Sequence, residues 1–451
     1  MTPSEYAQLL LQRLPCEAVA VAPDHRQAGE LWARSGAMWL SGHAKGPPRP
    51  CPAPLASCAQ GAWLALAALA PQHLAPDFEA YRLLGERAAI AGLSRQGRTS
   101  AGGACRLWDT ADGVLALNLA REDDLELLPA WTEGAASGVD DLTAALPHCA
   151  MEPLVARARL LGLAAAAVMP PQPQESWFRA TPCAPSFTRA SLSPPPAAQQ
   201  AAEPAALAPN AGHTPLVVDL SALWAGPLCG QLLRSCGARV IKVESARRPD
   251  GARYGPPALF DLLNTGKESV QLDFACDHDV GVLKTLLSRA DIVIEGTRPR
   301  ALEQLGIVAT EVVAARPGQV WLSITGYGRD EPQREWIAYG DDAAVAAGLS
   351  WLMGGDRGDP VFGGDAIADP LTGLHSALTA YAYWLSGGGV VLDVALHNVV
   401  SWCLGMPATS GNGTDVAAEP PVARTPTAPA AALGADTERV LAWLEASSHD
   451  G

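Results

Sequence analysis

Strand-length apolar runs alternate with helix-like segments through the middle of the chain, and this alternation restricts the possible folds most. The runs are Leu216–Asp219, Arg239–Glu244, Ala290–Glu295 and Val320–Ile324. Segments of helical length lie between them. Because parallel strands need such crossovers, the pattern predicts an α/β fold with a doubly wound, mostly parallel, Rossmann-like sheet.

Two stretches rich in Pro and Ala divide the chain. Residues 170–213 and a second stretch from Met406 to Ala432 show no periodic apolar face, which is typical of semi-rigid connectors. They separate an N-terminal block of residues 1–169 from a central Rossmann-like block of residues 214–405. The remainder, residues 406–451, is predicted to be a Pro-rich tail that ends in a helix over Asp436–Ala446.

Charge and apolar run lengths exclude several classes of partner. The net charge is -15, so a nucleic acid or an acidic membrane surface would be repelled and a polyanionic ligand needs a local basic pocket. Apolar runs such as Ala62–Ala70 fall short of the roughly 20 residues of a membrane-spanning helix. The start of the chain lacks a secretory pattern, and the ten cysteines show no metal-binding spacing. We therefore expect a cytoplasmic protein with reduced thiols and no bound metal.

The two flanks of the chain resemble each other. A shift of 312 residues places Gly36 and Trp39 on Gly348 and Trp351, and Pro48 on Pro360, without a gap. This register predicts an internal duplication. It also places Ser57 opposite Asp369.

Six segments of the central block together resemble a known family. They are VVDLSALWAGPLCGQLLRSCGARVIKVE from Val217, NTGKESVQLDF from Asn264, ADIVIEGTRPRALEQLGI from Ala290, WLSITGYGR from Trp321, DPVFGGDAIADPLTG from Asp359 and GGVVLDVA from Gly388. In this order they are similar to the class III CoA-transferases, the family of formyl-CoA transferase, L-carnitine dehydratase and the bile-acid-inducible protein relatives.

The resemblance implies an activity, a nucleophile and a domain arrangement. Such enzymes move CoA from an acyl-CoA to a free carboxylate through a covalent aspartyl intermediate, need no other cofactor and form homodimers. Asp369 falls on the nucleophile position. The segment similar to the family's small α+β domain, about residues 100–165, lies upstream of the sheet, so the domain order is rearranged. Residues 1–169 would be a degenerate first copy.

The residues around Asp369 suit that chemistry and also a simpler role. Pro370 and the apolar residues that follow predict a helix with Asp369 as its N-cap. A helix start favours a carboxylate and a developing oxyanion, and Gly363 and Gly364 let the backbone come close to a thioester. A plain cap explains the same pattern. Ser57 would cap equally well without a carboxylate, which indicates that the first copy is a scaffold.

Candidate CoA contacts lie where strands of the sheet end or helices begin. Backbone N–H groups and cations at the carboxyl edge of a doubly wound sheet bind phosphates. For each cation, a solvated surface position is the alternative. The candidates are Ala225, Gly226, Pro227, Arg247, Arg248, Lys267, Arg298 and Arg300, together with Gly363 and Gly364 near the thioester.

Three other functions are alternatives to a CoA-transferase. A racemase of the same family would need a His where this chain has Asp341 and Asp342, so the proton-transfer pair is incomplete. A nicotinamide dehydrogenase would need G-x-G-x-x-G after the first strand, which is absent. A homologue that binds CoA esters without turnover remains the main alternative. His375 could approach the site, although a hydrogen-bonded structural His is the simpler interpretation.

Overall fold

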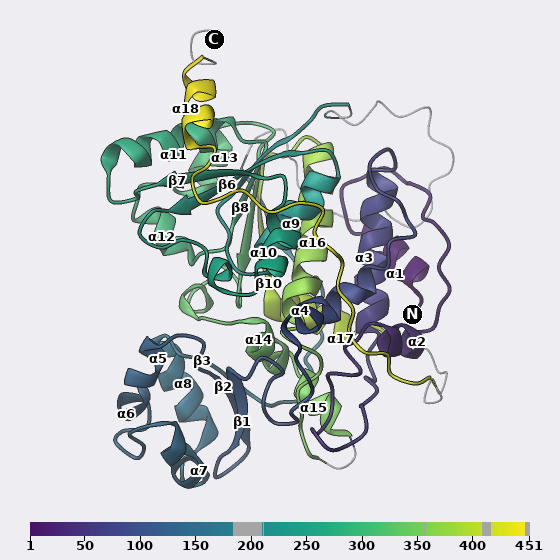
Figure 1. The fold of residues 1–451 in the computed structure, drawn as a ribbon, viewed down its shortest axis with the longest axis vertical. Helices are drawn as coiled ribbons and strands as arrows, with labels where there is room; N and C mark the ends of the chain where they lie inside the picture. Colours follow the sequence, from purple (N-terminus) through teal and green to yellow (C-terminus); the bar gives the residue numbers. More distant parts are fainter. Residues whose placement is uncertain (184–209, 211, 356–357, 408–415, 447–451) are drawn as a thin grey trace.

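The computed structural model describes residues 1–183, 210, 212–355, 358–407 and 416–446 (Figure 1). No helix among these residues is long and apolar enough to cross a membrane. The α-helices are α1 (Pro3–Leu11), α2 (Ala28–Arg34), α3 (Leu55–Leu69), α4 (Leu83–Ala91), α5 (Asp123–Glu126), α6 (Leu128–Trp131), α7 (Leu142–Ala145), α8 (Met151–Leu161), α9 (Ala225–Ser235), α10 (Pro257–Asn264), α11 (Asp277–Arg289), α12 (Pro299–Glu303), α13 (Ala309–Ala315), α14 (Gly340–Ala346), α15 (Leu349–Gly354), α16 (Ala368–Leu385), α17 (Leu396–Leu404) and α18 (Thr437–Ala446).

The larger sheet has seven strands in the order β4-β10-β9-β8-β5-β6-β7. All neighbours pair in parallel except β4, which is antiparallel to β10. The prediction of an α/β fold with a mostly parallel sheet is therefore confirmed. The strands are β4 (Arg179–Pro182), β5 (Leu216–Asp219), β6 (Arg239–Ser245), β7 (Glu268–Leu272), β8 (Ile292–Glu295), β9 (Val320–Thr325) and β10 (Val390–Ala395).

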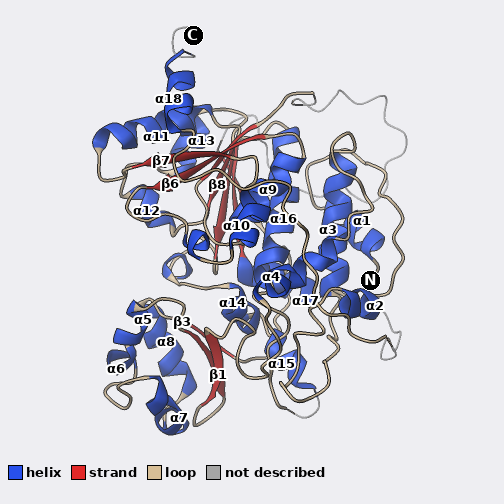
Figure 2. Ribbon diagram, viewed as in Figure 1, coloured by secondary structure: helices blue, strands red, loops and turns tan. Residues whose placement is uncertain are grey.

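Helices cover both faces of this sheet (Figure 2). Apolar side chains from alternate positions of the strands pack on one face against α9, α16 and α17. The opposite positions, such as Val218 and Val293, pack against α11, α13 and α18. Strands buried on both faces explain why their sequences read as continuous apolar runs. The strand order reverses between β5 and β8, which places a ligand crevice at the carboxyl ends of these two strands.

A second, smaller sheet lies upstream of the large one in sequence. It has three antiparallel strands, β1 (Cys105–Asp109), β2 (Val114–Asn118) and β3 (Ala164–Ala167). Helices α5 to α8 pack on one side of it around Trp131 and Leu142, which are fully buried. Its other side contributes Leu107 and Ala116 to a contact with Val345 of α14. The smaller sheet therefore packs directly on the helix that precedes the Asp369 region.

The helix pair α1–α3 repeats the packing of α9–α16. A Cβ atom at Gly61 of α3 would lie 2.7 Å from the Pro3 carbonyl oxygen, and a Cβ atom at Gly373 of α16 would lie 2.9 Å from the Ala225 carbonyl oxygen. Gly61 and Gly373 are the residues that the 312-residue shift aligns. Both crossings therefore need a glycine for close backbone approach. This parallel favours the duplication that the sequence predicts.

Turns before these helices are also alike. Gly36 and Gly348 both have a positive φ, at 79° and 98°. Leu40 and Leu352 each donate a backbone hydrogen bond to the carbonyl of that glycine. Helices α3 and α16 lie side by side in one apolar cluster (Figure 1). The two halves of the repeat thus share one core.

The predicted connector of residues 170–213 is wrong in its first part. Trp177 is fully buried and its indole N–H donates to the Thr379 hydroxyl. Residues Arg179–Pro182 then form β4 at the edge of the sheet. Burial of the Trp177 ring and the pairing of β4 with β10 therefore give this segment an ordered structure despite its Pro-rich composition. Residues 184–209 and 211 of the predicted connector lie outside the described residues.

The C-terminal tail packs along the surface of the N-terminal block and of the large sheet. Its Arg424 pairs with the buried Glu86 of α4, at 2.7 Å between Nε and Oε1. Further on, the Thr265 hydroxyl donates to the Ala428 carbonyl. Helix α18 forms as predicted, and Asp436 and Thr437 at its start accept hydrogen bonds from backbone N–H groups of β7. The tail therefore joins the N-terminal block to the sheet and covers the β7 edge.

We expect Gly373→Ala to lower the free energy of unfolding by about 1–3 kcal/mol, since its methyl group overpacks the α9–α16 crossing. The matched control is Gly281→Ala in α11, where a Cβ atom would meet nothing within 4 Å. That change should be neutral or stabilising by up to about 1 kcal/mol. Chemical denaturation measures both. Equal effects of the two substitutions would contradict the close approach.

Candidate active site

Asp369 lies in the first turn of α16 and does not cap it. The helix begins at Ala368 and its N-cap residue is Ile367, so the predicted N-cap position is wrong by two residues. The shift arises because Ala366 turns the chain into the helix with a φ of 42°. A positive φ on a residue with a side chain costs free energy and is typical of functional sites. Asp369 therefore belongs to the first turn of the helix and does not occupy the N-cap position in front of it.

The Asp369 carboxyl group is packed between two other helices. A Cβ atom at Gly340, the first residue of α14, would overlap its Oδ2 atom. The backbone N–H of Ala225, at the start of α9, lies close enough to lower its pKa. Burial raises the pKa of Asp369 to about 7, although the charge of Arg87 and the Ala225 N–H act in the opposite direction. Near pH 7 this side chain thus exists in both protonation states.

The N-terminal block holds the loop that precedes Asp369. Arg87 of α4 donates from Nε to Oδ2 of the fully buried Asp365, at 2.8 Å, and its guanidinium lies 5.3 Å from the Trp224 ring. The Ser41 hydroxyl accepts from the Gly364 N–H at 2.9 Å. The Phe362 N–H donates to the Gly97 carbonyl. Three contacts from residues 41–97 therefore fix the backbone beside the candidate nucleophile.

One expectation for this loop needs correction. The Gly364 N–H is not free to bind a thioester oxygen, because Ser41 already accepts its hydrogen bond. Gly364 has a φ of 78°, so its glycine is required by the turn. Gly363 packs against Leu349 and Met353. Both glycines shape the loop, and we do not retain Gly364 as a donor to substrate.

Two further carboxyl groups are buried beside the site. Asp341 accepts a hydrogen bond from the Ala366 N–H at 2.9 Å, and burial together with Asp365 raises its pKa to about 6. Asp342 accepts from the Asn118 amide at 2.9 Å, and burial raises its pKa to about 7. Its Oδ2 atom is buried without a hydrogen-bond partner. Within the described residues, no group of three His, Cys, Asp or Glu side chains is placed to hold a metal ion.

The serine that corresponds to Asp369 has a different setting. Ser57 is the third residue of α3, whose N-cap position is Pro54, so the predicted capping role of Ser57 is wrong. Its hydroxyl is buried without a hydrogen-bond partner. His375 also lies away from reactive chemistry, because its Nε2 atom is 2.7 Å from the Tyr6 hydroxyl and its Nδ1 atom 2.7 Å from the Leu371 carbonyl oxygen. The structural interpretation of His375 therefore holds.

Ala225, Gly226 and Pro227 form the first turn of α9, beside the crevice between β5 and β8. A Cβ atom at Gly226 would overlap the side chain of Ser221, and one at Gly296 would lie 2.9 Å from the Ser221 Cβ. Both glycines therefore let the loops after β5 and β8 close on each other. These loops also position Arg298, the residue two after Gly296.

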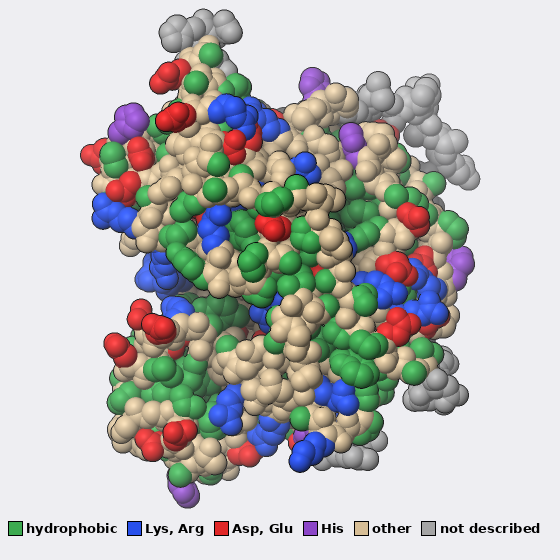
Figure 3. Space-filling model, in the orientation of Figure 1, with side chains coloured by type: hydrophobic (Ala, Val, Ile, Leu, Met, Phe, Trp, Pro, Cys, Tyr) green, Lys and Arg blue, Asp and Glu red, His purple; other side chains and the backbone are tan. Residues whose placement is uncertain are grey.

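Four arginines gather beside this crevice. Burial lowers the pKa of Arg298, and the nearby charges of Arg300, Arg121 and Arg248 lower it further. We call Arg121, Arg248, Arg298 and Arg300 the arginine cluster. Arg121 comes from the loop before α5, in the N-terminal block, and sequence reasoning missed it because nothing in the sequence indicates that this loop faces the sheet. Figure 3 shows Lys and Arg side chains along the recess between the upper and lower parts of the molecule.

Lys267 and Arg247 are engaged elsewhere, and Arg300 of the arginine cluster is itself paired with a carboxylate. Lys267 is 4% exposed, and its amino group donates to Asp219, to the Pro227 carbonyl and to Asn264, at 2.8, 2.8 and 3.1 Å. Lys267 is therefore part of the sheet interior, and its prediction as a phosphate contact is wrong. Arg247 pairs with Asp273 at 2.9 Å and its side chain is 69% exposed. Arg300 pairs with Glu335 at 3.0 Å.

Comparison with known proteins finds a family match for part of the chain. Residues 215–434 match the model of the family described as CoA-transferase family III. We call residues 215–434, slightly under half of the chain, the family III segment. The family III segment contains every strand of the large sheet except β4, the Asp369 helix and most of the tail. The N-terminal block, with Arg87 and Arg121, lies outside it.

The relatives cover the same part of the chain. A succinyl-CoA--D-citramalate CoA-transferase of Chloroflexus aurantiacus is 31% identical over 195 residues, which are 41% of this chain and 48% of that protein. An acyl-CoA transferase of Fusarium pseudograminearum is 32% identical over 244 residues, 49% of this chain and 53% of that one. A crystal structure of a CAIB/BAIF family protein from Brucella suis is 32% identical over 44% of this chain and 56% of that chain, with a TM-score of 0.37. The chain spans about half the length of these relatives.

The buried acid Asp342 predicts a pH dependence of stability. Its folded pKa of about 7 lies above the ordinary value of 3.8 for an aspartate, so the folded state binds the extra proton and stability falls as the pH rises between these values. Asp342→Asn removes this loss. We expect the stability gain of the variant over wild type to grow by on the order of 2 kcal/mol between pH 5 and pH 8.

Urea denaturation at the two pH values measures this difference. The matched control is Asp140→Asn, which changes an exposed carboxyl group and should leave the wild-type pH dependence intact. A gain for Asp342→Asn that is the same at pH 5 and pH 8 would contradict the raised pKa.

Proposed function

We propose that this protein is an acyl-CoA:carboxylate CoA-transferase in which Asp369 is the nucleophile. The observation that carries the proposal is the position of the Asp369 carboxyl group, packed between the starts of α9 and α14 at the crevice of a family III sheet. Relatives named succinyl-CoA--D-citramalate and succinate--glutarate CoA-transferase share this segment. The proposed donor is accordingly an acyl-CoA thioester, and the proposed acceptor is a carboxylic acid.

The proposed reaction exchanges acyl bonds of similar energy. An Asp369 oxygen attacks the thioester carbonyl carbon, the C–S bond breaks, and a mixed anhydride and the CoA thiolate result. The thiolate then attacks the Asp369 carboxyl carbon and releases the first acid, which leaves a CoA thioester on the enzyme. The acceptor carboxylate repeats the two steps in reverse, so that CoA leaves on the new acid and Asp369 is restored.

The surroundings of Asp369 fit these steps. Attack requires the ionised carboxylate, and burial strips it of water, which increases its reactivity. Arg87 counteracts the rise of its pKa and places positive charge near the oxygen on which negative charge develops. The Ala225 N–H at the start of α9 adds a hydrogen-bond donor. The N-terminal block would thus supply a charge that the family III segment lacks.

The arginine cluster suits the phosphates of CoA. Like charges in close proximity repel each other, and a bound polyanion relieves that repulsion. The cluster lies beside the strand-order reversal, where doubly wound sheets bind ligands. Arg298 follows β8 and is half-buried, so it is held in place better than Arg247. We assign Arg298 and Arg248 to CoA binding, with Arg121 facing them from the N-terminal block.

Asp369→Asn should abolish CoA transfer while the fold stays intact, because the amide cannot form the anhydride. Wild-type protein incubated with an acyl-CoA at pH 8, where Asp369 is ionised, should carry a mass adduct on the peptide that contains Asp369. Ser57→Ala is the matched control and should retain both adduct and activity. Circular dichroism verifies folding. A wild-type protein that binds the acyl-CoA but shows neither adduct nor exchange would instead be a CoA-ester-binding homologue.

Arg298→Gln should raise the KM for acyl-CoA about tenfold or more and leave kcat nearly unchanged, since a phosphate contact acts equally on the ground state and the transition state. Arg247→Gln is the control, because the exposed Arg247 pairs with Asp273. Its KM should stay within about twofold of wild type. Steady-state kinetics measure both variants. Similar KM values for the two would contradict the assignment of CoA to the arginine cluster.

A further inference from the structure

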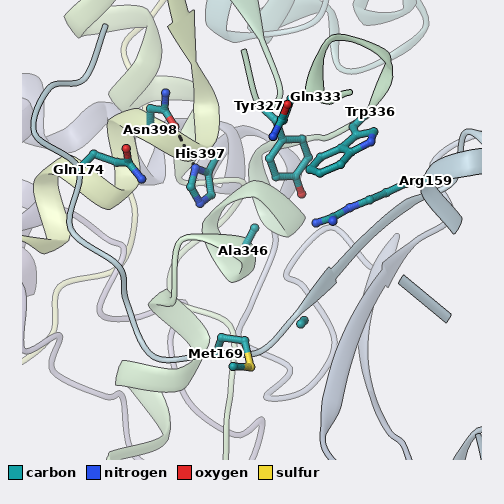
Figure 4. A pocket seen from close by; sticks show the side chains of 10 residues that line it. Arg159, Met169, Gln174, Tyr327, Gln333, Trp336, Ala346, His397 and Asn398 are labelled. Atoms are coloured by element: carbon teal, nitrogen blue, oxygen red, sulfur yellow. Dashed lines mark hydrogen bonds between the residues drawn. The ribbon is translucent and has the colours of Figure 1, made fainter. Parts of the chain in front are cut away.

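A polar cavity lies at the carboxyl ends of β9 and β10, on the far side of α14 from Asp369. Its volume is about 380 Å³. The smaller sheet domain, the chain that leaves it, the loop after β9, the end of α14 and the start of α17 line it (Figure 4). The lining residues are Arg159, Ala167, Met169, Gln174, Tyr327, Gln333, Trp336, Ala346, His397 and Asn398.

Arg159 of α8 brings a positive charge into this cavity. Its guanidinium stacks 3.8 Å from the centre of the Trp336 ring, and its Nε atom is buried without a hydrogen-bond partner. Within the part of the chain that the structure describes, no carboxylate lies within 4 Å of it, whereas Arg157 on the same helix pairs with Glu133 at 2.7 Å. Arg159 as a residue is partly buried, and a partly buried cation without a counter-charge is stabilised when an anion reaches it. Arg159 is therefore placed to bind an anion.

Tyr327 places a hydroxyl group beside that charge. The hydroxyl oxygen is buried and has no hydrogen-bond partner. Burial and Asp342 raise the pKa of Tyr327, while Arg159 lowers it, so the hydroxyl keeps its proton and acts as a donor. Figure 4 shows the Tyr327 hydroxyl and the Arg159 guanidinium directed toward the same point of the cavity. A guanidinium and a hydroxyl together match the two oxygens of a carboxylate.

The rest of the wall carries no second net charge. Burial lowers the pKa of His397, whose Nδ1 atom is 3.0 Å from the Asn398 amide oxygen, so its ring is neutral near pH 7. Gln174 and Gln333 contribute amides, and Met169 and Ala346 contribute apolar surface. One positive charge favours a singly charged head group over a phosphate with two negative charges. Amides and apolar surface suit a short carbon chain attached to it.

The cavity is separate from the Asp369 carboxyl group because α14 lies between them. Gly340 faces Asp369, and Ala346 faces the cavity. Six residues at 100° each place these two positions roughly 120° apart around the helix. An acid bound beside Arg159 is thus not aligned with the reacting atoms.

We propose that this cavity is a binding site for a short organic acid, held through its carboxylate by Arg159 and Tyr327, and distinct from the site at Asp369. This inference goes beyond the proposed transferase activity and does not depend on it. Arg159 of α8 and Trp336 of the loop after β9 both line the cavity. A bound acid would therefore contact both the smaller sheet domain and the carboxyl edge of the large sheet.

Isothermal titration calorimetry of the full chain with succinate, butyrate and inorganic phosphate tests the proposal. At least one of the two organic acids should bind wild type, and phosphate should not. Arg159→Gln should weaken binding about tenfold or more, because a charged hydrogen-bond partner is lost. Tyr327→Phe should weaken it in the same direction. Asp369→Asn should bind like wild type, which distinguishes this site from the proposed catalytic one.

Arg106→Gln is the matched control, since Arg106 also stacks on a tryptophan of the smaller sheet domain, 4.5 Å from the Trp108 ring, but lies outside the cavity. It should bind the acid like wild type. Circular dichroism and thermal melts verify that each variant is folded. The proposal is overturned if neither acid binds wild type, if Arg159→Gln binds as tightly as wild type, if only phosphate binds, or if Asp369→Asn removes binding.

Discussion

The ion pair between Arg87 and Asp365 is the interaction on which the candidate active site depends. Asp365 is fully buried, and a buried carboxylate without a partner would be strongly destabilising. Arg87 lies in the N-terminal block, outside the family III segment. The loop before Asp369 can therefore take its observed conformation only when the N-terminal block is in place, and the same guanidinium acts on the pKa values of Asp341 and Asp369.

The similarity of the two helix pairs explains how the N-terminal block fits this position. Helices α1 and α3 cross through Gly61 as α9 and α16 cross through Gly373, and α3 packs along α16. Among the residues that the structure describes, the first pair has no sheet of its own beneath it, and it shares the apolar core of the second. At the aligned position it has a buried serine in place of the aspartate. A scaffold role needs only the packing, which a serine preserves.

Sequence patterns predicted the sheet well and the site only in part. The apolar strands of β5, β6, β8 and β9 are visible because burial on both faces leaves a continuous signal in the sequence. Asp369 was recognised through its motif, but its place in the helix was not, since the positive φ of Ala366 leaves no compositional trace. Lys267 shows why the environment of a cation could not be predicted from the sequence. A lysine before a strand is typical of a surface charge, and only the structure reveals that Asp219 neutralises it inside the protein.

The positions of Arg87, Arg121 and Arg159 could not be predicted because they depend on contacts between distant parts of the chain. Each comes from a different element of the N-terminal block, and each meets the family III segment at a different point: beside Asp369, at the arginine cluster and in the cavity near Tyr327. The chain as a whole is acidic, with a net charge of -15. An acidic surface repels anions at long range, so cations concentrated at an internal interface determine where anions can bind. In this protein that interface lies between the N-terminal block and the sheet, so both proposed ligand sites depend on the two together.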